Sequence, residues 1–197
     1  MKTLIISLKI FLFFTIVTGV VYPLLITGIA QVGFSSKANG SIILKDGKPI
    51  GSSLIGQQFD SSIYFASRPS FTLYNPLPSG GSNLGLTSLK LKKLVYERKQ
   101  KFIRFNHLDS LTVVPSEMLF ASASGLDPHI SPEAAFLQVE RVAIARGFNP
   151  NQKELLNNLV QQNIEKPQFN LLGEPRINVL ILNIEIDELS KINTNNK

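Results

Sequence analysis

Hydrophobic positions dominate the first fifth of the chain and are interrupted by charges everywhere else. From Ile10 to Ser36, 27 consecutive residues carry no formal charge, and the first half of this run has no polar stripe that could face water. A helix needs about 20 apolar residues to cross the hydrocarbon core of a bilayer. The pattern therefore predicts a transmembrane anchor helix over residues 10–36, preceded by a short N-terminal segment, residues 1–9.

Two interpretations of this segment compete. A cleaved signal peptide would use Lys2 and Lys9 as its basic region and the small residues at 28–30 as its cleavage site. We favour a retained anchor, because the apolar run is about twice as long as the hydrophobic region of a signal peptide. In both cases the two lysines predict a cytoplasmic N-terminus, which places the rest of the chain outside the membrane.

Small and polar residues recur every four positions along the predicted anchor. This ridge consists of Thr15, Gly19, Pro23, Thr27 and Gln31. Residues four apart lie along one face of a helix, and small residues there let a second helix backbone approach closely. We interpret the ridge as a contact with a membrane partner; the alternative is an isolated anchor with an incidental proline kink.

The remaining residues predict one compact domain of mixed α+β class at 37–190, followed by a flexible, asparagine-rich tail at 191–197. The turn signal Asp46-Gly47 predicts a β-hairpin. Helix-start signals at Thr87 or Ser88, at Ser131 and at Asn149 predict three helices, the first ending near Phe105. Alternating apolar residues predict a late strand at Ile177, Val179 and Ile181. We therefore expect an α+β fold with one transmembrane helix and an extracytoplasmic domain.

The amino-acid composition excludes several kinds of catalytic and metal-binding site. The chain contains no cysteine, no tryptophan and two histidines, so thiolate zinc sites and cysteine nucleophiles are excluded and a histidine-built metal site has little material. The predicted helix at 88–105 is strongly basic, although the net charge of the chain is only +6. A solvated helix face accounts for these charges better than an anionic lipid surface. The aromatic residues of this helix do not interleave with the charges as a stacking platform, so we expect no nucleic-acid partner.

One polar cluster brings Ser124, Asp127 and His129 within a few residues of each other. A membrane-anchored hydrolase or binding protein of the cell envelope is the alternative function that this cluster suggests. However, position 122, where a nucleophile elbow requires glycine, is serine. A tight turn in which these side chains bond backbone amides is the preferred interpretation. The glycine-rich stretch 79–85 is a weak phosphate-loop candidate, because it lacks the Gly-Lys-Ser/Thr ending.

Several blocks together resemble one family, the C subunit of the Kdp-type potassium-transporting P-type ATPase. The blocks are residues 19–28, 51–57, 64–70, 79–85, 121–131, Gln138 with 141–143 and 145–147, and 178–180 with 182–183. The resemblance implies a non-catalytic subunit of an ATP-driven potassium uptake complex in the cell inner membrane, beside a pore-forming subunit and an ATP-hydrolysing subunit. The chain agrees in lacking the Asp-Lys-Thr-Gly phosphorylation motif. The resemblance implies no cofactor bound by this chain alone.

The resemblance also implies a catalytic chaperone that raises the ATP affinity of the pump subunit, with ATP shared between the two chains. The candidate contacts for nucleotide or partner are Gly80, Gly81, Ser82, Asn83, Ser122, Ser124 and Asp127. A domain outside the membrane cannot reach cytoplasmic ATP. We therefore rank higher a second role, in which the domain stabilises the assembly, covers the outer mouth of the pore, and gathers cations with Asp127.

Overall fold

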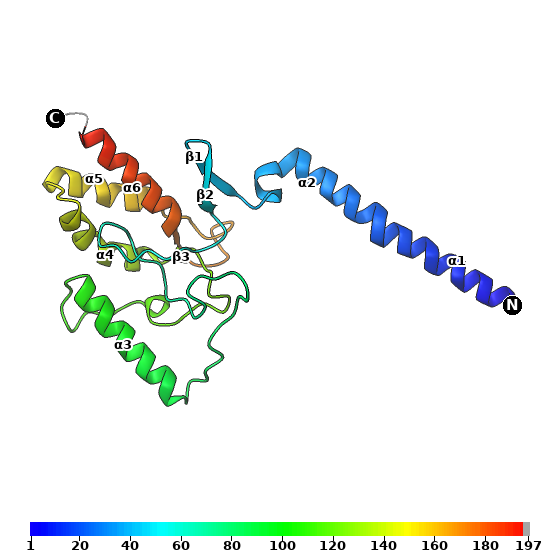
Figure 1. The fold of residues 1–197 in the computed structure, drawn as a ribbon, viewed down its shortest axis with the longest axis horizontal. Coiled ribbons are helices and arrows are strands. Elements are labelled where there is room, and N and C mark those ends of the chain that lie inside the picture. Colours follow the sequence, from blue (N-terminus) through cyan, green and yellow to red (C-terminus); the bar gives the residue numbers. More distant parts are fainter. Residues whose placement is uncertain (195–197) are drawn as a thin grey trace. The chain divides into compact units, whose positions relative to one another are not determined.

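A computed structural model describes residues 1–194, the last four of them by their backbone only. The chain divides into two compact units, Met1–Ser52 and Ser53–Lys197 (Figure 1). The first unit holds a long helix and a hairpin, and the second holds the remaining helices and two short strands. The predicted mixed fold, with one N-terminal apolar helix ahead of a compact α+β region, is confirmed.

One long helix, kinked near its C-terminal end, forms most of the first unit. It consists of α1 (Lys2–Ile16), the π-helical segment η1 (Val17–Val21) and α2 (Tyr22–Ala38). None of its residues is buried within the chain, and over the described residues it is the one helix long and apolar enough to cross a membrane. Phe34 departs from helical backbone angles near the end of this helix.

The π-helical segment lies where the sequence weakens the helix. Proline has no N–H, so Pro23 cannot bond the carbonyl of Gly19 one turn earlier, and its ring crowds that carbonyl. In the turn before it, Tyr22 N–H reaches the carbonyl of Val17, five residues back. A single widened turn of this kind accommodates the proline without ending the helix.

The predicted hairpin is present as β1 (Ile42–Lys45) paired with β2 (Lys48–Ser52). Asp46 and Gly47 both have positive φ, at 52° and 75°, as a two-residue type I′ turn requires. The hairpin belongs to the first unit, where Ser52 Oγ donates to the carbonyl of Gly40 at 2.7 Å. The sequence predicts this hairpin within the compact domain that begins at residue 37.

The described residues of the second unit form four α-helices. They are α3 (Leu89–Phe105), α4 (Pro132–Ala145), α5 (Pro150–Gln162) and α6 (Val179–Thr194), with a 3-10 turn η2 (Ser116–Met118). The three predicted helix starts are confirmed: the side chains of Ser88, Ser131 and Asn149 each accept a bond from the amide three residues later. Helix α5 contacts both α4 and α6 (Figure 1).

The predicted late strand is wrong beyond its first residues. Strand β4 is only Ile177–Asn178, paired antiparallel with β3 (His129–Ile130), and helix α6 begins at Val179. Asn178 Oδ1 accepts a bond from Ile181 N at 3.2 Å, as a helix cap does. The structure continues α6 to Thr194, past the start of the expected tail at 191–197; residues 195–197 lie outside the described residues.

Buried side-chain amides hold a non-helical segment against the helices. Phe65 is fully buried, and its N–H and carbonyl bond the amide of Asn183 at 2.8 and 2.9 Å. Gln138 receives Ala66 N–H at 2.7 Å. The side chain of Arg141 donates to the carbonyls of Ser62, at 2.5 Å, and Tyr64, at 2.9 Å. These side chains satisfy the backbone of residues 62–66 as a neighbouring strand would, and so fix where the following loop lies.

Candidate functional site

The two predicted candidate loops lie against each other. Gly80 N–H donates to the carbonyl of Ser124 at 3.0 Å. A Cβ added at Gly81 would lie 3.2 Å from the carbonyl oxygen of Ala123. The structure therefore brings residues 80–81 of the glycine-rich stretch to the polar turn 122–127 through backbone contacts.

A third loop joins the same contact. Gly56 N–H donates to the carbonyl of Leu126 at 2.7 Å, and a Cβ at Gly56 would lie only 2.7 Å from the carbonyl oxygen of Asp127. Gly125 has φ +71°, and a Cβ there would lie 2.9 Å from Thr72 Oγ1. We call the contact of residues 56, 80–81 and 122–127 the glycine junction. Its glycines permit close backbone packing, and two of its amides are used between loops rather than offered to a phosphate.

The serine and asparagine candidates stabilise local turns. Ser124 Oγ accepts from Leu126 N at 3.1 Å, and Ser82 Oγ accepts from Leu84 N at 3.4 Å. Asn83 has φ +54°, which asparagine tolerates better than most residues. Ser122 differs, because its hydroxyl is buried and has no hydrogen-bond partner in the described part of the chain. Ser124 is thus better explained as a turn-stabilising residue than as a nucleophile.

Asp127 is already fully engaged. Its carboxylate lies 2.6 Å from Arg68 Nη1, and it accepts from His129 N–H at 3.0 Å with His129 Nδ1 at 3.2 Å. Burial alone would raise the pKa of Asp127, but the bonds from His129 and the charge of Arg68 outweigh burial and lower that pKa to about 2. These bonds give the carboxylate of Asp127 a structural role in the turn. Within residues 1–190, no group of three potential metal ligands occurs.

The ridge residues of the long helix are not covered by this chain. A Cβ at Gly19 would meet nothing within 4 Å. Thr15 Oγ1 donates to the carbonyl of Phe11 at 2.8 Å, so its proton is satisfied within the helix. Gln31 exchanges hydrogen bonds with Asn39 at 3.2 and 3.3 Å. The ridge therefore allows a second helix to approach closely at Gly19. The hydrogen-bond donors of Thr15 and Gln31 are already used within the chain.

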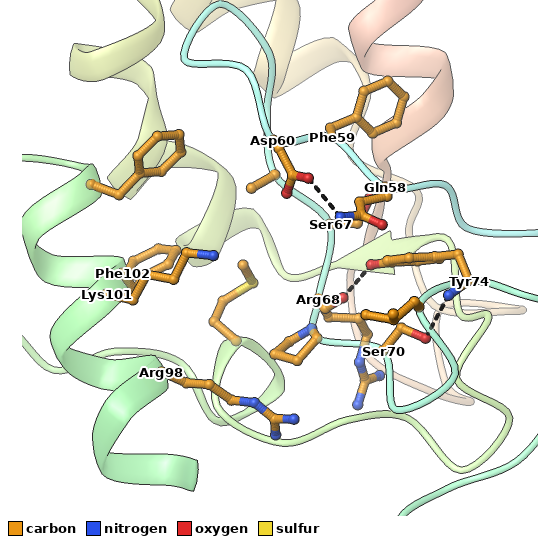
Figure 2. A pocket seen from close by; sticks show the side chains of 15 residues that line it. Gln58, Phe59, Asp60, Ser67, Arg68, Ser70, Tyr74, Arg98, Lys101 and Phe102 are labelled. Carbon is orange, nitrogen blue, oxygen red and sulfur yellow. Dashed lines mark hydrogen bonds between the residues drawn. The ribbon is translucent and has the colours of Figure 1, made fainter.

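Sequence reasoning missed a cavity of about 400 Å³ between α3 and the loop at 58–74. Figure 2 shows Arg98 and Lys101 reaching from α3 toward this loop. The other charged lining residues are Asp60 and Arg68, and none of the predicted candidate residues lines the cavity. The sequence feature that could have indicated this cavity is the basic helix at 88–105, whose charges the sequence analysis interprets as a solvated face.

The long apolar helix followed by a compact α+β unit is the layout of a membrane-anchored protein with a domain in water. The model of the family described as KdpC, K+-transporting ATPase, c chain, matches residues 4–188. A relative from Dechloromonas aromatica, named potassium-transporting ATPase KdpC subunit, is 48% identical over 195 residues, covering 97% of this chain and all of the relative. A relative of the same name from Photorhabdus laumondii is 46% identical, covering 93% of this chain and 94% of the relative. The chain belongs to the KdpC family.

Proposed function

We propose that this chain is the accessory subunit of an ATP-driven, high-affinity potassium uptake complex, and that it assembles with a pore-forming subunit and an ATP-hydrolysing subunit in the cell inner membrane. Potassium is the transported ion. The observation that carries the proposal is the helix of residues 2–38, whose side chains are all left unburied by the rest of the chain. Membership of the KdpC family supports the partners.

The π-helical segment strengthens the ridge as an assembly surface. In a regular α-helix, a step of four residues advances about 40° beyond one full turn, so a ridge spaced by four winds around the helix. The wider turn of Val17–Val21 rotates less per residue and offsets this drift between Thr15 and Pro23. With Gly19 at its centre, the first half of the ridge then presents a straighter groove to a neighbouring helix.

The second unit, on this proposal, acts outside the membrane, where it stabilises the complex and covers the outer mouth of the pore. Lys2 and Lys9 at the N-terminus support this orientation. An effect on the ATP affinity of the pump subunit would act through assembly. The amide of Gly80 and the carboxylate of Asp127, which a shared nucleotide site would need, are both engaged inside the chain.

A bulky residue on the ridge tests the proposal. A Cβ added at Gly19 meets nothing within 4 Å, so the chain with Gly19→Leu should fold normally while the added side chain blocks an approaching helix. We expect at least about a tenfold loss of partner subunits co-purified with the tagged variant, the effect of losing roughly 1–2 kcal/mol of helix–helix contact. A deletion strain carrying this variant should fail to grow at micromolar potassium.

Gly28→Leu is the matched control, because Gly28 lies off the ridge and also has no atom within 4 Å of an added Cβ. It should assemble and support growth as the unmodified chain does. Equal co-purification with both variants, or equal loss with both, would show that the ridge does not determine assembly.

A further inference from the structure

The cavity beside α3 contains cations that the chain does not neutralise. Arg98 is half-buried and donates from Nη1 to the carbonyl of Leu119 at 2.8 Å. Within residues 1–190, neither Arg98 nor Lys101 forms an ion pair. Burial lowers the pKa of Arg98, which reflects the cost of holding this charge away from water.

The other charged groups at the cavity have partners within the chain, although Arg68 Nε is buried without a hydrogen-bond partner among the described residues. Arg68 is paired with Asp127 at 2.6 Å. Asp60, the one acidic residue in the lining, accepts a hydrogen bond from Gln58 Nε2 at 2.6 Å (Figure 2). The uncompensated charge of the cavity is therefore positive and comes from the α3 side.

Much of the remaining wall is apolar. Phe59, Phe102, Phe105 and Met118 line it with Tyr74 beside them, and the polar residues Gln58, Ser67 and Ser70 also line the cavity. Tyr74 is held in place, because its hydroxyl donates to the carbonyl of Arg68 and its amide bonds Ser70 Oγ at 2.9 Å (Figure 2). Phe105 is fixed from another side by the guanidinium of Arg141, 4.4 Å from the centre of its ring.

We propose that this cavity binds an amphiphilic anion, a phosphate ester whose charged group pairs with Arg98 and Lys101 and whose apolar part packs on Phe102, Phe105 and Met118. A guanidinium with free N–H groups beside a flexible ammonium suits a phosphate, which carries more charge than a carboxylate. The volume of about 400 Å³ lies within the range of small-molecule sites. The source of the ester is either the headgroup of an anionic lipid or a soluble organic phosphate. This site is independent of the role in assembly.

The full chain, purified in a neutral detergent, is titrated with three probes. Phenyl phosphate and inorganic phosphate are followed by ³¹P NMR, and phosphatidylglycerol is compared with phosphatidylcholine by native mass spectrometry. We expect saturable binding of phenyl phosphate or of phosphatidylglycerol, and binding of phenyl phosphate at least about tenfold tighter than of inorganic phosphate if the soluble ester is the ligand. Retention of phosphatidylglycerol alone would identify the lipid headgroup as the source.

The variant Arg98→Gln with Lys101→Gln should weaken binding by at least about tenfold, because it removes both charge-assisted contacts. The control, Lys90→Gln with Lys92→Gln, removes the same charge from exposed positions on α3 that do not line the cavity, and should weaken binding less than about twofold. If the first variant does not fold, Lys101→Gln alone tests the site, since the exposed Lys101 makes no bond within the described chain. Equal weakening by both double variants, equal binding of the two phosphates without lipid selectivity, or no binding of any probe would overturn the proposal.

Discussion

The long helix and the second unit satisfy opposite requirements. In the helix, most backbone groups are bonded to the neighbouring turn and the hydrophobic side chains face outward, which is stable only in lipid or against other helices. In the second unit, hydrophobic residues such as Phe65 and Leu156 face inward, and buried amides and guanidinium groups complete the backbone bonding of an irregular loop. The first region depends on partners outside the chain for its contacts, whereas the second depends on a few of its own polar side chains.

Among substitutions that test this difference, one at Arg141 should change the free energy of unfolding most. It is almost fully buried and bonds Asn106 Oδ1 at 2.8 Å as well as the carbonyls of Ser62 and Tyr64. Arg141→Met leaves these acceptors buried without donors, so we expect a loss of about 3–5 kcal/mol in the free energy of unfolding. The measurement is urea unfolding of the full chain in detergent, followed by near-ultraviolet circular dichroism.

Arg176→Met is the control for that prediction. Arg176 pairs with Glu165 at 2.9 Å, but their side chains are 57% and 44% exposed. We expect a loss of less than about 1 kcal/mol. Similar losses for the two variants would mean that the buried network does not organise the second unit.

The next effect concerns the glycine junction. Gly56→Ala would place a methyl group 2.7 Å from the carbonyl oxygen of Asp127, a backbone atom that cannot move alone, so we expect a loss of about 2–3 kcal/mol. Gly80→Ala meets nothing within 4 Å and should change stability by less than about 0.5 kcal/mol. Unfolding midpoints of the two variants provide the comparison. A neutral Gly56→Ala would contradict the packing role of the junction.

The smallest expected effect is the pH dependence contributed by Asp127. Its pKa in the folded chain is about 2, below its ordinary value of 3.8, so its contribution is complete above pH 3.8 and is lost as the pH falls through 2. Because the carboxylate is partly exposed, we expect this contribution to be about 1 kcal/mol. Between pH 5 and pH 2, Asp127→Asn should lose less stability than the unmodified chain. Parallel stability curves for the two proteins would rule out this linkage.

The features predicted correctly are those that neighbouring residues determine. The caps at Ser88, Ser131 and Asn149 are bonds between a side chain and an amide three residues later, and the turn at Asp46-Gly47 needs only its own backbone angles. The apolar helix likewise follows from composition over one continuous segment.

The features missed depend on contacts between distant segments. Ile177, Val179 and Ile181 alternate like a strand, but Val179, Leu182 and Ile186 also form a helical face that packs into the core. The glycine junction joins residue 56 to residue 127, so the role of its glycines could not be distinguished from a phosphate loop by spacing alone. The cavity required the loop at 58–74 to be held in place by Gln138 and Arg141 of α4 and by Asn183 of α6.

The most direct test of the account is a measurement of how the chain is oriented in the membrane. Because the chain has no cysteine, a single introduced cysteine reports on one position alone. Ser110→Cys, at an exposed position in the second unit, and Thr3→Cys, near the N-terminus, are treated in spheroplasts with a membrane-impermeant maleimide. The account predicts labelling of Ser110→Cys in intact spheroplasts and of Thr3→Cys only after lysis. Labelling of Thr3→Cys in intact spheroplasts, with Ser110→Cys protected until lysis, would contradict a domain that acts from outside the membrane.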